Sequence, residues 1–264
     1  MSKNLIFSTL IHGKPLISTL PEAPVFLREH LAIPSQDIMD SLPLDQKLGH
    51  LYEDAFEVIL KTSERYETLE KGLQIQSNKH HTLGEIDYLF RDLLSGQLIH
   101  LELAIKFYLS IDTKQKILLP GPDARDNYYK KLEHLRNHQL KLTRNYRKHL
   151  PEAYQGESII VKQLTIGRIF DHITSNVYAF PEFLNPSASR GQWLHQKEFS
   201  NQFPDNPKIQ IIPKYLWPAP ISQLPQALLP LNIQDPLMRC TMVKIEGKDQ
   251  PYFIAPDNYP EQGL

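Results

Sequence analysis

Cysteine is nearly absent from this chain of 264 residues, which contains only Cys240. A single cysteine excludes an intramolecular disulfide and any zinc site built from several thiolates. We therefore expect a reducing, cytoplasmic setting. No apolar run reaches the length of a membrane-spanning helix, so no membrane partner is expected. Gly13, Lys14 and Pro15 interrupt the apolar stretch 5–20, which predicts a loop or edge element rather than a signal peptide.

The chain also lacks an excess of charge and the common cofactor motifs. Its formal net charge is -1, with 41% hydrophobic and 22% charged residues, which is ordinary for a globular protein. It contains no glycine-rich dinucleotide fingerprint, Walker loop, paired-histidine zinc motif or nucleophile elbow. Candidate catalytic or binding residues must therefore be sought outside these motifs.

Proline divides the chain, with seven prolines before residue 150 and fourteen after it. The periodicities of residues 1–150 give the order helix, strand, strand, strand, helix. This order predicts an α/β (α+β) fold whose core is a small mixed sheet flanked by helices. Residues 151–264 are expected to form a β-rich C-terminal region that packs on or beside this core. Helices are predicted over residues 44–62 and 126–146, and strands over 66–76, 84–92, 97–110, 158–169, 208–217, 239–245 and 250–254.

Two of these strands carry acidic side chains among residues that belong in a core. The strands over 84–92 and 97–110 flank the turn signal Ser95-Gly96, which predicts an antiparallel hairpin. Because side chains alternate along a strand, this hairpin can bring Asp87, Glu102 and Lys106 together on one face. Buried carboxylates are costly unless they are paired or hold a metal.

Magnesium prefers such carboxylate oxygens, so Asp87 and Glu102 are candidate ligands for Mg²⁺ or Mn²⁺. Lys106 would orient the attacking water or stabilise charge on a phosphate. The alternative is that each acid simply lies on the solvated face of its strand.

Two further polar residues lie beside apolar stripes of the predicted helices. Glu53 follows Gly49, which would let the first helix approach the sheet, and could reach the metal; alternatively, it is an ordinary surface acid. Gln139 occupies the stripe of the second helix, for which Asp126 is the expected N-cap. It could bond an active-site water or a phosphate, or mark the place where the stripe meets solvent.

The segment 125–150 is strongly basic, with eight cations and two acids, Asp126 and Glu133, for a charge of +6. Tyrosines are interleaved with the cations. Such a patch favours a polyanion through counterion release and base stacking, although a solvated helix face has the same composition. The candidate nucleic-acid-binding residues are Lys130, Lys131, Arg136, Lys141, Arg144, Arg147 and Lys148.

Several of these segments together resemble a bacterial family labelled domain of unknown function 1853, which itself resembles the PD-(D/E)XK nuclease superfamily. The matching pieces are Leu48-Gly49-x-x-x-Glu53, Gly84-Glu85-Ile86-Asp87, residues 100–109, and Lys131-Leu132-x-His134-x-x-x-His138-Gln139. The resemblance implies a restriction-endonuclease-like core in which Asp87 and Glu102 bind the metal, Glu53 is the helix acid and Gln139 supports the site. One position departs from the superfamily pattern, because Ala104 stands where its lysine usually lies. Lys106 lies roughly 6–7 Å further along the strand.

The sequence thus predicts a metal-dependent nuclease that uses Mg²⁺ or Mn²⁺ and cuts nucleic acid, with DNA as the expected substrate. Ala104 motivates a rival, a catalytically inactive nucleic-acid-binding module on a nuclease-like scaffold. A third alternative is a protein-interaction domain in which the acids are structural. Residues 151–264 would cover the sheet, bind substrate or form a homodimer.

Overall fold

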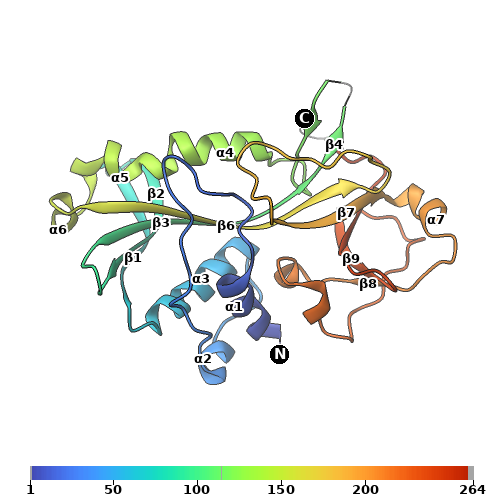
Figure 1. Cartoon of the computed structure of the whole chain (residues 1–264), viewed down its shortest axis with the longest axis horizontal. Coiled ribbons are helices and arrows are strands. Elements are labelled where there is room, and N and C mark those ends of the chain that lie inside the picture. The colour runs from blue at the N-terminus through green and yellow to red at the C-terminus, as the bar shows by residue number, and fades with distance from the viewer. Residues whose placement is uncertain (1, 114, 261–264) are drawn as a thin grey trace.

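One mixed sheet of eight strands runs through the computed structural model, which describes residues 2–113 and 115–260 (Figure 1). The strand order is β1-β2-β3-β6-β7-β10-β9-β8. The α/β class is therefore confirmed, but the expectation of a small sheet is wrong. The strands are β1 (Tyr66–Asn78), β2 (His81–Asp92), β3 (Leu98–Leu109), β6 (Ile159–His172), β7 (Ser189–His195), β8 (Ile209–Ile211), β9 (Thr241–Ile245) and β10 (Tyr252–Ala255).

Helices cover both faces of the half of the sheet that contains β1, β2, β3 and β6 (Figure 1). On one face lie α1 (Ser2–His12), α2 (Gln36–Asp40) and α3 (Leu48–Lys61); on the other lie α4 (Tyr128–Asn137) and α5 (Leu142–Asn145). Among the described residues, no helix is long and apolar enough to cross a membrane. The short elements are β4 (Ile111–Asp112), β5 (Ile117–Leu118), α6 (Glu152–Gln155), α7 (Phe199–Gln202) and 3-10 turns at Gln139–Lys141, Arg147–His149, Gln196–Glu198, Lys214–Leu216 and Ile221–Gln223.

The predicted order of helix, three strands and helix is present as α3, β1, β2, β3 and α4. β1, β2 and β3 are antiparallel neighbours, and α4 lies on the crossover that brings β6 back parallel to β3. The β3–β6 pairing extends from Leu98 with Ile159 to Leu109 with Phe170. The sheet therefore continues across the boundary expected at residue 150, and the later strands lengthen it.

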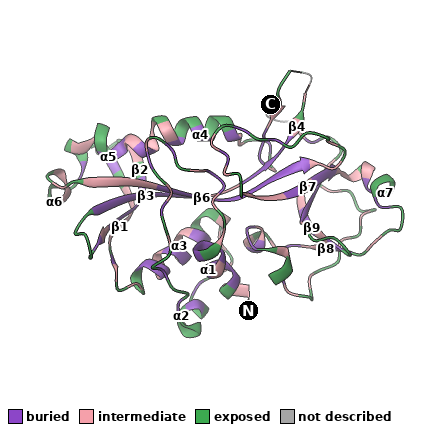
Figure 2. Ribbon diagram, in the orientation of Figure 1, coloured by how far each residue is buried: buried purple, intermediate pink, exposed green. Residues whose placement is uncertain are grey.

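The core between α3 and the sheet follows from the apolar stripe of that helix. Tyr52 and Phe56 are fully buried and pack with Tyr88, Phe90 and Leu101 of the central strands. Full burial of each such side chain stabilises the fold by about 1.5–3 kcal/mol. Figure 2 shows this burial concentrated along the sheet and on the inner sides of the helices.

The stretch 5–20, predicted as a loop or edge element, divides into a helix and a segment along the edge of β6. Residues 2–12 form α1, with Ile6, Phe7 and Leu10 fully buried against the α3 side of the core. Gly13 and Pro15 end this helix instead of preventing it. The chain then follows β6, where Leu16 N–H donates to the Thr165 carbonyl at 2.7 Å. β7 pairs with β6 only from Arg168 onward, so this segment covers an edge of β6 that would otherwise be open.

The helix predicted over residues 126–146 is broken at His138. α4 ends at Asn137, and His138 has φ -125° and ψ -69°, outside the helical region. A 3-10 turn and α5 follow, and this path buries Leu140 and Leu142. The expected N-cap is also displaced by one residue. Asn127, not Asp126, accepts the Tyr129 N–H at 3.0 Å.

Gly167 sets how closely β6 approaches β3, because a Cβ at this position would overlap the backbone carbonyl of Lys106. Backbone cannot move aside as a flexible side chain would. We expect Gly167→Ala to lower the free energy of unfolding by about 1–3 kcal/mol. Gly156→Ala is the matched control, since no atom lies within 4 Å of its added Cβ. Urea denaturation of both variants tests this prediction; equal stabilities would contradict it.

Candidate metal and nucleic-acid site

The two acids predicted as metal ligands meet where β2 and β3 part. The last paired residues are Tyr88 and Leu101; beyond them β2 stays with β1, and β3 stays with β6. Past this fork, Leu103 N–H donates to Asp87 Oδ2 at 2.8 Å. The backbone N–H of Asp87 faces the Glu102 carboxylate and lowers its pKa. Asp87 thus accepts an N–H that has no partner strand at this point, and both acids lie together at the fork.

Burial makes both carboxylates hard to ionise. It raises the pKa of Asp87 to about 8, with a further contribution from the negative charge of Glu102. Burial likewise raises the pKa of Glu102 to about 8, although the Asp87 N–H and Gln139 oppose the shift. At neutral pH both groups therefore tend to keep their protons, unless a cation compensates their charge.

Glu102 is held by partners on both of its oxygens. His100 Nε2 lies 2.7 Å from Oε1, and Gln139 Nε2 donates to Oε2 at 2.6 Å. Burial lowers the pKa of His100 to about 3, so this ring is neutral and its Nε2 shares a hydrogen bond with Glu102. The break after α4 turns Gln139 toward the sheet. Gln139 therefore contacts a predicted metal ligand directly.

A cavity of about 320 Å³ lies at this fork, between α3 and α4. Four of the five predicted catalytic residues line it, namely Glu53, Asp87, Lys106 and Gln139. The negative charge of Glu53 contributes to the raised pKa of both Asp87 and Glu102, so Glu53 acts on the same site. Gly49 is exposed and also lines the cavity; an added Cβ there would meet only Glu53 Oε1, at 3.7 Å. Gly49 thus borders the cavity and is not a point of close helix–sheet contact.

Lys106 contacts an acid other than the predicted pair. Its Nζ lies 3.1 Å from Asp126 Oδ2, and both side chains are partly buried. Ala104, which occupies the usual lysine position, lines the same cavity. The lysine therefore lies at the wall of the site, with Asp126 as its ionic partner.

The seven predicted nucleic-acid-binding cations divide into two groups. Two nitrogens of Arg136 donate to the Glu22 carboxylate, and its guanidinium lies over the Phe183 ring. Arg147 donates to the backbone carbonyls of Gln155 and Glu157. Lys141 donates to the side chain of Asn137. These three have roles within the fold. The exposed cations are Lys130, Lys131, Arg144 and Lys148.

The structure adds residues to which the sequence analysis gave no role at this site. Glu85 contributes to the raised pKa of both acids, and its spacing of two residues from Asp87 was the available signal. His134 lines the cavity beside Lys131, which was predicted only as a backbone-binding cation. Their three-residue helical spacing places them on one side of α4.

Comparison with known proteins identifies one family. The model described as "Domain of unknown function (DUF1853)" matches residues 16–240, in agreement with the family expected from the sequence. No curated protein and no solved structure matches the chain.

The raised pKa values predict that metal-free stability falls as the pH rises. In the unfolded chain these carboxyls titrate near pH 4, whereas both folded pKa values are about 8. Between these limits the folded state binds more protons, so the free energy of unfolding decreases with increasing pH. We expect Asp87→Asn, which cannot ionise, to make this decrease shallower from pH 5 to pH 8.

Urea denaturation in chelator measures the effect, and the exposed Asp205→Asn serves as the control. Addition of Mn²⁺ at pH 8 should restore stability to the unsubstituted chain but not to Asp87→Asn. The same pH slope in both variants would contradict the assignment.

Proposed function

Because the chain belongs to the DUF1853 family, whose description names no activity, we propose a function from the site itself. The protein is a metal-dependent nuclease that hydrolyses phosphodiester bonds of nucleic acid, with DNA as its substrate. One observation carries this proposal: Asp87 and Glu102 lie together at the fork of β2 and β3, beside a cavity that other polar side chains line.

The donor set fits a hard divalent cation. The Glu102 carboxylate is buried and that of Asp87 is partly buried, and both have a pKa of about 8. Mg²⁺ or Mn²⁺ would replace their protons and supply the positive charge that the pair lacks. Asp87 and Glu102 would hold the ion, and Glu53 adds negative charge nearby. When bound, such an ion activates water and polarises the scissile phosphate.

The remaining residues orient and charge the site. Gln139 and His100 fix both oxygens of Glu102, which keeps the carboxylate aimed in one direction. Lys131 and His134 border the cavity from α4 and would contact the phosphate backbone. Lys106 would orient the attacking water after exchanging its contact with Asp126. The exposed cations Lys130, Arg144 and Lys148 extend this basic surface along the chain.

The topology also supports a nuclease. The order α3, β1, β2, β3, α4 agrees with the helix–strand–strand–strand–helix order that the PD-(D/E)XK resemblance implies. Asp87 lies on the second of these strands and Glu102 on the third. This argument is an analogy of fold and carries less weight than the carboxylate pair.

A second candidate function is a nucleic-acid-binding module without catalysis. The contact between Lys106 and Asp126, together with Ala104 at the usual lysine position, favours it. The two functions differ in cleavage and in the effect of chelator. The module binds nucleic acid without cleaving it, and chelator does not change this binding. A protein-interaction domain would show no nucleic-acid binding even at low salt.

Cleavage assays with Mg²⁺ or Mn²⁺ separate these functions. We expect Asp87→Asn and Glu102→Gln each to reduce cleavage by at least about 1,000-fold, because bound metal supplies several kcal/mol of transition-state stabilisation. The Asn side chain of the first variant can still accept the Leu103 N–H, so the fold should persist. Circular dichroism checks this, and Asp205→Asn is the activity control. Cleavage that survives in both variants would reject the proposal.

Lys131 provides a test of nucleic-acid binding that does not require cleavage. We expect Lys131→Ala to weaken binding of duplex DNA and to reduce the slope of log K against log salt by about 1. Lys208, exposed near the far edge of the sheet, supplies the matched control Lys208→Ala. Fluorescence anisotropy at several salt concentrations measures both. Equal slopes of log K against log salt for the two variants would show that Lys131 does not contact the nucleic acid.

A further inference from the structure

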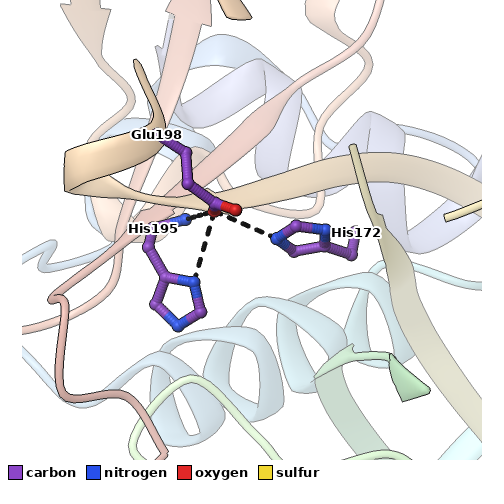
Figure 3. A group of neighbouring side chains, drawn as sticks. All are labelled: His172, His195 and Glu198. Atoms are coloured by element: carbon purple, nitrogen blue, oxygen red, sulfur yellow. Dashed lines mark hydrogen bonds and ion pairs between the residues drawn. The ribbon is translucent and has the colours of Figure 1, made fainter. Parts of the chain in front are cut away.

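A second cluster of potential metal ligands lies in the other half of the sheet. His172 is the last residue of β6 and His195 the last residue of β7, and these two strands are parallel neighbours. Glu198 follows in the 3-10 turn Gln196–Glu198. Figure 3 shows the three side chains pointing toward one another. The carboxyl ends of adjacent parallel strands are a common position for binding sites.

The three side chains are close enough to share one ion. One ligand atom from each lies within 4.8 Å of the others. His172 Nε2 is 3.1 Å from Glu198 Oε2, and His195 Nδ1 is 3.2 Å from the same oxygen. The side chains retain 19%, 21% and 27% of their accessible surface, so solvent and a metal ion can reach them.

The outer nitrogen of each ring already has a hydrogen-bond partner. His195 Nε2 lies 2.9 Å from the Tyr259 carbonyl oxygen, which can only accept, so this nitrogen carries a proton. His195 Nδ1 faces the Glu198 carboxylate, and its ring also takes part in the capping box with the Glu198 backbone. His172 Nδ1 accepts the Thr174 N–H at 3.4 Å and lies 2.8 Å from Thr174 Oγ1, so its Nε2 is the nitrogen that faces Glu198.

We propose that His172, His195 and Glu198 form a binding site for a divalent first-row transition-metal ion such as Zn²⁺. A cation among them would be coordinated by the inward nitrogen of each ring and by the carboxylate oxygen, which lie close enough to share one ion. Two imidazoles and one carboxylate form a donor set that zinc and its neighbours in the periodic table prefer. The partial exposure leaves further coordination positions for water or a small ligand.

The surroundings of the cluster are those expected around a metal site. Tyr259 and Thr174 hold the orientation of the two rings, as hydrogen-bond partners of ligating histidines usually do. Trp193 is buried and contacts both rings, with centroid distances of 4.6 Å to His172 and 5.0 Å to His195. Its Nε1 donates to the Ser110 carbonyl at 2.8 Å, so the indole itself is held.

Glu198 also has a structural role, which the test must separate from metal binding. It accepts the His195 N–H at 2.7 Å, as part of a capping box at the start of the 3-10 turn. Glutamine can accept the same N–H but provides a neutral and weaker metal ligand. Glu198→Gln therefore retains the cap while impairing the proposed site.

This site is distinct from the one at Asp87 and Glu102. Glu102 pairs with Gln163 of β6, and His172 lies nine residues further along that strand (172 − 163). At the rise of a β-strand this corresponds to roughly 30 Å. The inference therefore does not depend on the proposed nuclease function.

Titration calorimetry of the full chain with Zn²⁺, after removal of metals and any affinity tag, tests the proposal. We expect one ion per chain at this site, and a loss of affinity of at least about 100-fold in His172→Ala and in Glu198→Gln, since even outer partners of a metal site contribute 10–100-fold. The control is His80→Ala, which removes an exposed histidine elsewhere. This variant should bind Zn²⁺ as the unsubstituted chain does.

Co²⁺ absorption provides a second readout that does not depend on stability. Visible d–d bands should appear on addition of Co²⁺ and be lost in Glu198→Gln, with an unchanged circular dichroism spectrum. The proposal is overturned if the unsubstituted chain binds no Zn²⁺ at micromolar concentrations. It is equally overturned if His172→Ala and Glu198→Gln bind as well as His80→Ala does, because the ion would then occupy other surface histidines.

Discussion

The separation of β2 from β3 is the constraint on which the proposed active site depends. A strand that leaves its neighbour exposes backbone N–H groups, and these must find other acceptors. Here the Asp87 carboxylate accepts the Leu103 N–H, and Glu102 lies beside it. The contacts at the fork thus place a partly buried acid beside a fully buried one. Their raised pKa values are the electrostatic cost of this arrangement, and a divalent cation is the partner that would offset it.

The fork could be anticipated from sequence only in part. The turn signal between the two strands predicted that Asp87 and Glu102 lie on adjacent strands, and side-chain alternation predicted that they share a face. Helical periodicity predicted the bounds of α3 to within a few residues. The ion pair of Lys106 with Asp126 could not be predicted, because it depends on the loop that carries Asp126 back to β3. The break at His138 was missed for a similar reason. The apolar stripe through Leu135 and Leu142 fits a straight helix, and only tertiary packing of Leu140 decides against it.

β6 connects the two halves of the molecule. The sequence suggested a division near residue 150, since proline becomes frequent there, yet β6 pairs with β3 over most of its length. The frequency of proline reflects local chain stiffness and gives no information about which distant strands pair.

The cluster of His172, His195 and Glu198 could not be predicted from the sequence either. Its members come from three elements, and only His195 and Glu198 lie close together in the sequence.

The central claim is that Asp87 and Glu102 jointly bind a divalent cation. The most direct measurement is a crystal structure of the full chain soaked in Mn²⁺, with anomalous scattering recorded to locate the ion. We expect an anomalous peak at the fork, within coordinating distance of oxygens from both carboxylates. A well-ordered fork without a peak, in which Asp87 bonds only the Leu103 N–H and Glu102 only Gln139 and His100, would contradict the account. The acids would then serve the fold alone.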